Sequence, residues 1–324
     1  MPTIYDVARE AGVSAATVSR VLNGRRTVDP EMVARVLTAV RELGYRPNAV
    51  ARNLRRSRTT LWAVIVPDIG NPFFTSTVRG IEDVAQQAGY SVVLCNSDES
   101  PAKEETYVAA ALSEQMAGVI IASSGSVKAA RCLLDSPVPV VAIDRELPRG
   151  AVDTVVVDNE EGARAATRHL LDAGYSRVAC VTGPEGVSTA DLRLRGYAAA
   201  LGGAPVVVRT DFREQGGYDA MAALLSSPAR PDAVFVASNL MAVGALRCLA
   251  DRGVEVPGEV GLVGFDEIPW ADLVRPSLTT VAQPTYELGR MAARLLADRI
   301  TAPAARPATV VLPTELRPRR SSAR

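Results

Sequence analysis

The stretch TIYDVAREAGVSAATVSRVLN, residues 3–23, decides how the start of the chain folds. It predicts two short helices joined by a tight turn, at which Gly12 supplies a positive φ. Ala8 lets the two helices approach closely, and Val13 and Val18 are placed to fill the core between them. This is the helix-turn-helix pattern, whose second helix lies in the major groove of DNA.

Local signals mark where three helices begin. Thr3 and Asp6 have capping-box spacing for the first helix, and Ser14 can cap the second. Asp29 can cap a third helix, in which Pro30 takes the first position. The apolar residues of the third helix are expected to share one face and complete a three-helix core: Val33, Val36, Leu37, Val40 and Leu43.

If the second helix lies in the groove, Ala15, Ala16 and Arg20 face the base edges. An alanine can contact only a thymine methyl group, whereas Arg20 can make a bidentate contact to guanine worth ~1–3 kcal/mol of discrimination. The alternative for Arg20 is a solvated helix residue. Short donors suited to phosphate oxygens stand around these positions: Ser14, Thr17, Ser19 and Asn23.

A second arginine-rich segment, residues 45–60, reads YRPNAVARNLRRSRTT. Asn48 can cap a short helix over residues 49–56, which is too short to be stable alone in water. An exposed leucine, Leu54, stands among its arginines. The two interpretations of Leu54 are a minor packing residue and an apolar wedge for the minor groove of DNA.

The 324-residue chain is long enough for two or three folded units. Its net charge is zero, but residues 1–60 contain eleven arginines against five acidic residues, so a head of net charge +6 precedes a remainder of −6. A basic head on an acidic body suits a polyanion at one end only. No run approaches the ~18 apolar residues of a membrane span, and no basic-then-apolar leader is seen, so we expect a cytoplasmic protein.

The composition argues against an enzyme and against a metal site. The four cysteines are far apart and His169 is the only histidine, so the usual zinc sites lack their ligands. His169 stands in RHLLDAG as an ordinary helix residue, which argues against a Ser-His-Asp triad. No glycine-rich phosphate loop follows a predicted strand. We therefore expect no catalytic residue, no metal and no cofactor, and we expect the cysteines to be buried thiols in a reducing cytosol.

After Thr60, short apolar runs alternate with segments of helical spacing. Such alternation predicts parallel sheets covered by helices on both faces. The expected fold class is therefore an all-α head followed by an α/β body of two doubly wound lobes. The runs form two series of similar layout, at 61–66, 91–96, 118–122 and 138–144, then at 154–158, 177–183, 206–209, 233–238 and 260–266.

In such sheets, ligands bind beyond the carboxyl ends of the strands. The predicted strand ends are rich in hydroxyls, amides and carboxylates, with aromatic rings nearby. This set suits a polyol, because carboxylates accept hydroxyl protons and rings stack on C–H faces. The alternative is that these residues are turn formers and helix caps. They are Asn71, Asn96, Ser123, Ser124, Asp144, Arg145, Asp158, Ser238, Asn239 and Asp266, with Phe73, Phe74, Phe212 and Trp270.

The head, together with the YRPNAVARNL that follows it, resembles the lactose/galactose-repressor (LacI/GalR) family of bacterial transcription regulators. The resemblance implies that residues 49–56 form a hinge helix, which folds on DNA beside the hinge helix of a dimer partner. It also implies that Leu54 opens the central step of a pseudo-palindromic operator. The expected DNA-binding residues are Ser14, Ala15, Ala16, Thr17, Ser19, Arg20, Asn23, Asn48, Ala51, Arg52, Leu54 and Arg55.

The body is similar to the same family, and through it to the periplasmic sugar-binding proteins, in NPFF (71–74), LRLRGY (192–197), residues 256–284 and the closing LPTELRPR (312–319). The resemblance places the family's ligand threonine, arginine, aromatic ring and aspartate at Thr189, Arg193, Phe212 and Asp266. The expected effector-binding residues are Phe73, Phe74, Ser124, Asp144, Thr189, Arg193, Phe212, Asn239 and Asp266.

Two departures from the family pattern bear on the ligand. Ser238-Asn239 stands where many members have Asn-Asp, which removes one carboxylate expected of the ligand site. Val187 stands where the purine-binding member has an arginine, which argues against a purine. The stretch between Gly196 and Phe212 is also several residues shorter than usual.

The resemblance also implies the domain plan and the function. A helix-turn-helix head (1–46) and a hinge helix with linker (47–59) precede an effector-binding and dimerisation body (60–324). Lobe one is expected at about 60–158 plus 284–311, and lobe two at about 159–283 plus 312–324. We expect a homodimeric, sequence-specific transcription regulator, usually a repressor, that binds operator DNA and a small-molecule effector, a sugar. The alternative is a periplasmic-type solute-binding protein.

Overall fold

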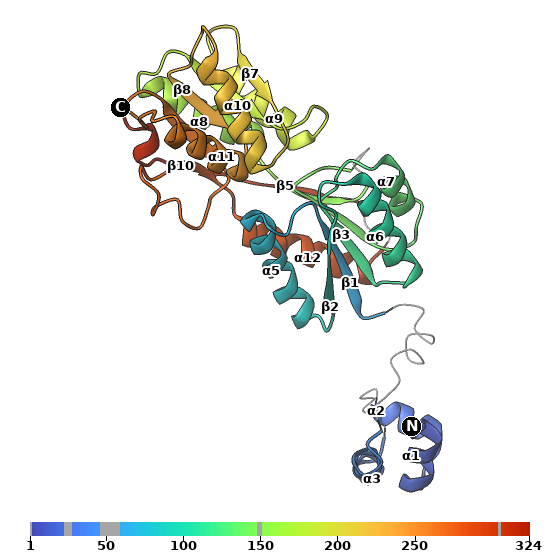
Figure 1. Ribbon diagram of the computed structural model, residues 1–324. Coiled ribbons are helices and arrows are strands. Elements are labelled where there is room, and N and C mark those ends of the chain that lie inside the picture. Colours follow the sequence, from blue (N-terminus) through green and yellow to red (C-terminus); the bar gives the residue numbers. More distant parts are fainter. Residues whose placement is uncertain (1, 23–27, 46–58, 148–150, 304–305) are drawn as a thin grey trace. The chain divides into compact units, whose positions relative to one another are not determined.

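The computed structural model describes residues 2–22, 28–45, 59–147, 151–303 and 306–324 (Figure 1). The chain divides into two compact units, Met1–Thr59 and Thr60–Arg324. Most of the expected hinge segment lies outside the described residues. Six of the expected DNA-binding residues do so as well: Asn23, Asn48, Ala51, Arg52, Leu54 and Arg55.

The first unit contains the three expected helices, α1 (Ile4–Ala11), α2 (Ala15–Leu22) and α3 (Pro30–Glu42). The Thr3 and Asp6 side chains form the predicted capping box. Gly12 ends α1 with a φ of +62°, and the Ser14 hydroxyl accepts a hydrogen bond from the Thr17 amide at 3.1 Å. The local signals therefore predicted the helix starts and the turn correctly.

The core of this unit differs from the prediction at Leu37 and Ala39. Leu37 was expected inside, but it is 46% exposed. Ala39, which was not foreseen, is buried beside Val36. The buried stripe of α3 follows the helical period through Val36 and Ala39, and this leaves Leu37 on the flank of the stripe. From the same helix, Arg35 donates hydrogen bonds to the carbonyls of Ala11 and Gly12, each at 3.0 Å, and so ties α3 to the turn.

The second unit alternates strands and helices from Leu61 to Leu312, which confirms the expected α/β fold class. Its elements in chain order are β1 (Leu61–Val66), α5 (Pro72–Gln87), β2 (Ser91–Asn96), α6 (Pro101–Ser113), β3 (Gly118–Ile121), α7 (Val127–Leu134), β4 (Val140–Ile143), β5 (Asp153–Val157), α8 (Asn159–Asp172), β6 (Val178–Thr182), α9 (Ser188–Ala200), β7 (Val206–Arg209), α10 (Glu214–Ser226), β8 (Ala233–Val236), α11 (Asn239–Asp251), β9 (Gly261–Phe265), β10 (Thr279–Ala282), α12 (Thr285–Thr301), β11 (Thr309–Leu312), β12 (Glu315–Arg317) and η2 (Arg320–Ser322).

Two six-stranded sheets define two lobes. Lobe one has the strand order β11-β5-β4-β3-β1-β2, and lobe two has the order β12-β10-β9-β8-β6-β7. All described pairings are parallel except β10 with β12. Helices α5 and α12 cover one face of the first sheet, and α6 and α7 cover the other (Figure 1). The two orders match strand for strand, so the lobes repeat one architecture.

The chain passes between the two sheets three times. The passages follow β5 at Val157, β10 at Ala282 and β11 at Leu312. The expected lobe limits of 158, 284 and 311 lie within two residues of these passages. β1 and β6 occupy equivalent places in the two sheets. In each lobe, the loops that follow the carboxyl ends of the parallel strands can therefore contribute to a site between the lobes.

Glycines allow the helices on each sheet to pack closely. A Cβ on Gly80 of α5 would lie 2.2 Å from the carbonyl oxygen of Tyr286, and one on Gly289 of α12 would lie 2.0 Å from that of Thr77. Both neighbours are backbone atoms, so no side-chain rotation can relieve such a contact. The α5–α12 pair beside the second crossover therefore depends on these two residues.

The cysteines correct another expectation. Cys180 and Cys248 are buried, as predicted, but Cys132 is exposed and Cys95 is half-buried. Cys132 lies on α7, whose buried face is formed by Ala129, Ala130 and Leu133, so its side chain points away from the sheet. The expectation that all four thiols are buried was therefore wrong.

Gly80→Ala should destabilise the second unit, because the added methyl group meets backbone of α12. Overpacking of this kind costs roughly 1–3 kcal/mol in the free energy of unfolding, measurable by urea denaturation. Gly202→Ala is the matched control, since nothing lies within 4 Å of the Cβ added there. Equal stability of the two variants would contradict the close approach.

Candidate functional site

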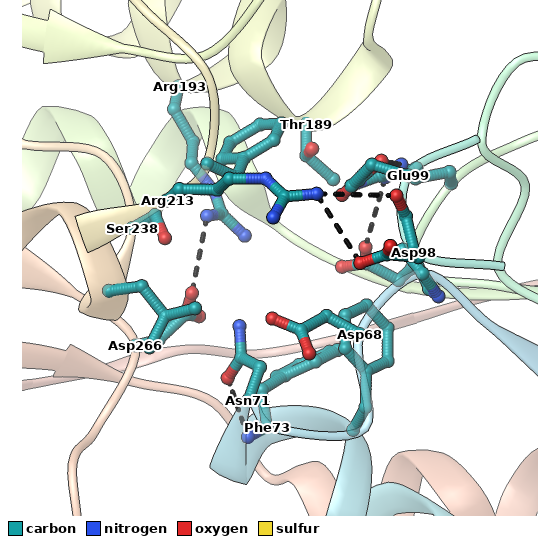
Figure 2. A pocket seen from close by; sticks show the side chains of 16 residues that line it. Asp68, Asn71, Phe73, Asp98, Glu99, Thr189, Arg193, Arg213, Ser238 and Asp266 are labelled. Atoms are coloured by element: carbon teal, nitrogen blue, oxygen red, sulfur yellow. Dashed lines mark hydrogen bonds and ion pairs between the residues drawn. The ribbon is translucent and has the colours of Figure 1, made fainter. Parts of the chain in front are cut away.

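A cavity lies between the lobes, at the carboxyl ends of the strands. Polar and charged side chains from both lobes converge on it (Figure 2). Its floor is buried, whereas Asp98 and Arg213 at its rim are about half exposed. The lining residues are Pro67, Asp68, Asn71, Phe73, Phe74, Asp98, Glu99, Asp144, Arg145, Thr189, Arg193, Phe212, Arg213, Ser238, Leu240 and Asp266.

Asp144 and Asp266 occupy equivalent places in the two lobes. Asp144 follows β4 and Asp266 follows β9, and both have a left-handed backbone, with φ of +61° and +73°. The amide of each donates to the neighbouring strand, to the Val155 carbonyl at 3.0 Å and to the Val281 carbonyl at 2.9 Å. A left-handed aspartate is uncommon and costs free energy, so this repeated feature marks a place where the fold fixes a carboxylate.

On the lobe-two side, Arg193 of α9 lies fully inside the protein. Its guanidinium donates to the Asn159 side chain and to the Ala237 carbonyl, both at 2.8 Å, and reaches Asp266 at 3.5 Å. Its plane lies over the Phe265 ring, 3.8 Å from the ring centre. The Gln283 side chain donates to the other oxygen of Asp266. These contacts position the carboxylate of Asp266.

On the lobe-one side, Arg145 makes a two-pronged ion pair with Glu99, at 2.8 and 2.6 Å, and donates to the Ser123 carbonyl at 3.0 Å. Its Nε is buried and makes no hydrogen bond within the described part of the chain. The nearest carboxylate oxygen, on Asp144, lies 3.7 Å from it. A buried donor beside a buried carboxylate forms a place for a group that can both accept and donate a hydrogen bond.

Burial raises the pKa of Asp144 to about 6, against the opposing effects of the nearby Arg145 and Arg193. At neutral pH the group is therefore mainly a carboxylate, able to accept hydrogen bonds from a ligand. Since desolvation penalises the charged form, a ligand that donates hydrogen bonds to Asp144 relieves this cost.

Aromatic rings supply the apolar walls. Phe73 and Phe74, in the first turn of α5, meet edge to face with ring centres 4.8 Å apart. Phe212 approaches from lobe two and lies beneath the Arg145 guanidinium, 5.4 Å from it. Gly183 leaves room for the Phe212 ring, because a Cβ there would lie 2.2 Å from the ring. The shorter stretch before Phe212 therefore still brings this ring into the cavity.

Two contacts join the lobes beside the cavity. Arg213 of lobe two pairs with Asp98 of lobe one at 3.3 Å (Figure 2). The Asn239 amide donates to the Asn71 side chain at 2.8 Å. The exposed ion pair contributes little stability by itself, about 0–1 kcal/mol. The buried amide contact is shielded from water and fixes the approach of α11 to α5.

Seven of the nine expected effector-binding residues line the cavity: Phe73, Phe74, Asp144, Thr189, Arg193, Phe212 and Asp266. The other two do not. The Ser124 hydroxyl bonds to that of Ser97 at 2.7 Å, and Asn239 supports Asn71 from behind the lining.

Residues that the sequence analysis did not assign also line the cavity. Asn71, Arg145 and Ser238 had been noticed only as strand-end residues. Asp68, Asp98, Glu99 and Arg213 carried no signal, because their place depends on how loops of the two lobes meet.

In the head, Ala16 and Arg20 are exposed on α2, whereas Ala15 is half-buried against the head core. The hydroxyls of Ser14 and Thr17 pair at 2.9 Å while Ser14 caps the helix. Ala16 and Arg20 are therefore the side chains of α2 most open to a partner among those expected to read bases.

Within the described ranges, no group of histidine, cysteine and acidic side chains could hold a metal ion. None of the described helices has the length and apolar character to cross a membrane.

Comparison with known proteins identifies the family. Residues 3–48 match the model of bacterial regulatory proteins of the lacI family, and residues 167–322 match the periplasmic binding protein-like domain. The ribose operon repressor of Halalkalibacterium halodurans is 40% identical, over 93% of this chain and 91% of that protein. The chain belongs to the LacI family.

Two solved LacI-family structures extend the comparison. The lac repressor dimer bound to operator and the anti-inducer ONPF has a TM-score of 0.87 at 28% identity, covering 99% of both chains. A LacI-family regulator from Enterococcus faecium with bound ribose has a TM-score of 0.74 at 32% identity, covering 81% of this chain and 98% of the other. The protein is thus a DNA-binding transcription regulator and not a solute-binding protein.

Asp144→Asn should change how stability depends on pH. Because folding raises the pKa of Asp144 from 3.8 to about 6, the wild-type group contributes stability that is fully present below pH 4 and lost as the pH rises through 6. The asparagine variant lacks this loss. The difference in free energy of unfolding, variant minus wild type, should therefore rise between pH 4 and 6.5, by up to about 3 kcal/mol. Urea denaturation across this range measures the difference; a difference independent of pH would contradict the raised pKa.

Proposed function

We propose that this protein is a cytoplasmic, homodimeric repressor that binds a pseudo-palindromic operator and is controlled by an uncharged monosaccharide, with D-ribose as the first candidate. The observation that carries the proposal is the buried cavity whose polar groups are only partly satisfied by the protein. The Nε donor of Arg145, which lines the cavity, is buried and makes no hydrogen bond within the described residues.

Hydroxyl groups match these partly satisfied positions. A hydroxyl between Asp144 and Arg145 can donate its proton to the carboxylate and accept from Nε, which satisfies both groups at once. Leaving a buried donor without a partner costs about 1–3 kcal/mol, so occupation is favoured. Phe73, Phe74 and Phe212 then offer ring faces and edges to the C–H groups of a sugar.

The charges of the cavity favour a neutral ligand. Its lining contains five carboxylates and three guanidiniums. Each guanidinium already contacts a carboxylate: Arg145 that of Glu99, Arg193 that of Asp266, and Arg213 that of Asp98. A phosphorylated sugar would find no uncommitted arginine and would be repelled by Asp68 and Asp144.

The relatives support ribose as the first sugar to test. One is named a ribose operon repressor and another was solved with bound ribose. The cavity lining contains no histidine or cysteine among the described residues, so we propose that the protein acts by binding and not by catalysis.

The binding of sugar must be coupled to the binding of DNA through the arrangement of the lobes. A ligand shifts this arrangement only by as much as it binds one arrangement better than another. The Asp98–Arg213 and Asn239–Asn71 contacts hold the arrangement in which the cavity is lined from both sides. We propose that the sugar selects one arrangement of the lobes. This arrangement would set the distance between the two hinge segments (residues 47–59), one from each subunit of the dimer.

D-Ribose should raise the melting temperature of the full-length protein, whereas D-ribose 5-phosphate and the disaccharide cellobiose should not. Ligand at 100 times its Kd adds about 2.7 kcal/mol to the free energy of unfolding. Thermal-shift assays followed by calorimetric titration make the comparison, with D-glucose as a second neutral monosaccharide. Equal or tighter binding of the phosphate would refute the charge argument, and binding of none of the sugars would refute the sugar site.

Arg20→Ala should weaken binding to an operator selected from random duplexes by about 1–3 kcal/mol and relax the base preference at one position of each half-site. Arg9→Ala on α1, where the arginine side chain is 80% exposed, is the control and should change affinity less and without a change of preference. Fluorescence anisotropy with variant operators provides the measurement. If Arg20→Ala kept both affinity and preference, Arg20 would not read a base.

A further inference from the structure

The C-terminal tail, residues 315–324, packs against the part of lobe two that carries Asp266. Strand β12 pairs with β10, placing Arg317 opposite Thr280 and Leu316 opposite Val281. Beyond it, Ser321 and Ser322 are fully buried. The Ser321 hydroxyl donates to the Leu262 carbonyl at 2.6 Å, and that of Ser322 lies 2.7 Å from His169 Nε2. The tail is thus built into the fold of lobe two.

Arg319 is the centre of this region, with its side chain only 14% exposed. Its guanidinium donates to Asp272 at 2.5 Å, to Glu267 at 3.1 Å, and to the Leu278 carbonyl and the Thr280 hydroxyl at 2.9 Å each. One planar group therefore holds both ends of the segment from Glu267 to Thr280. A lysine could not serve these acceptors together, because it lacks the planar fork.

The residue just before this segment is Asp266, whose carboxylate faces the cavity. The equivalent places in the two lobes differ here. After Asp144, the next side chain, Arg145, lines the cavity, whereas after Asp266 the next side chain, Glu267, faces Arg317 and Arg319 instead. Asp266 therefore keeps its left-handed backbone between a cavity on one side and an ion-pair cluster on the other.

We propose that Arg319 is a positioning residue for the ligand site, acting through Glu267 and β10 on Asp266 and on Gln283. The route is short. Arg319 binds Glu267, which is bonded to Asp266 through the chain, and it binds Thr280, whose neighbour Val281 accepts the Asp266 amide. Gln283, two residues further, donates to the Asp266 carboxylate. Without Arg319, Glu267 is left with the more exposed Arg317 as its ionic partner, and the backbone that aims Asp266 loses its tie to the tail.

This inference rests on the proposed function, and D-ribose binding to the full-length protein tests it. Arg319→Gln should weaken D-ribose binding by roughly three- to thirtyfold, the range seen for residues that act without touching the ligand. Arg320→Gln is the matched control, since Arg320 is exposed beside it in the sequence and should leave the Kd unchanged. Calorimetric titration is done at a temperature at which circular dichroism shows each variant fully folded.

A second variant separates positioning from a merely structural role. In Arg319→Gln combined with Glu267→Gln, two amides that can hydrogen-bond to each other replace the Arg319–Glu267 ion pair, while Arg317 keeps Glu315 as its ionic partner, so most of the lost affinity should return. Should Arg319→Gln not fold, Arg319→Lys carries the test and should bind D-ribose with intermediate affinity. A lowered melting temperature with wild-type Kd, or no recovery in the double variant, overturns the proposal. If the wild-type protein binds none of the sugars tested, both the proposed function and this inference fail. If the wild-type protein binds D-ribose and Arg319→Gln binds it with the same Kd, this inference alone fails.

Discussion

The burial of charged groups between the two lobes is the constraint on which the rest of the structure depends. Carboxylates and guanidiniums removed from water are costly unless each is paired and hydrogen-bonded. Arg193 meets this requirement through Asn159, the Ala237 carbonyl and Asp266, which come from separate elements of lobe two. Arg145 meets it only in part, since its Nε lacks a protein acceptor within the described residues. The unmet part of the requirement is the observation on which the proposed ligand site rests.

The duplicated architecture explains how such a site arises. Matching strand orders place Asp144 and Asp266 at equivalent strand ends, each with a left-handed backbone and an amide bonded to the next strand. The residues that follow are used differently. Arg145 turns into the cavity, whereas Glu267 turns to the arginines of the C-terminal tail. One fold repeated twice therefore yields two unlike walls of one cavity.

The sequence predicted the head well because its signals are local. A cap, a left-handed glycine and a helical period act over a few residues, and they located the three helices α1, α2 and α3; Leu37 was misplaced because it lies on the flank of the buried stripe. Prediction of the cavity was less complete. Strand-end position indicated Asp144 and Asp266 correctly as lining residues, but it also suggested Ser124 and Asn239, whose polar groups are used by neighbours.

By itself, the sequence determined the helix-turn-helix head, the alternation of strands and helices, and membership of a regulator family, since these depend on short-range patterns. Only the tertiary structure decided which polar side chains pair. Glu99 meets Arg145 across 46 residues of chain, Asp98 meets Arg213 across 115, and Asn71 meets Asn239 across 168. Such partners are set by which loops the two sheets bring together, and no local pattern encodes that meeting.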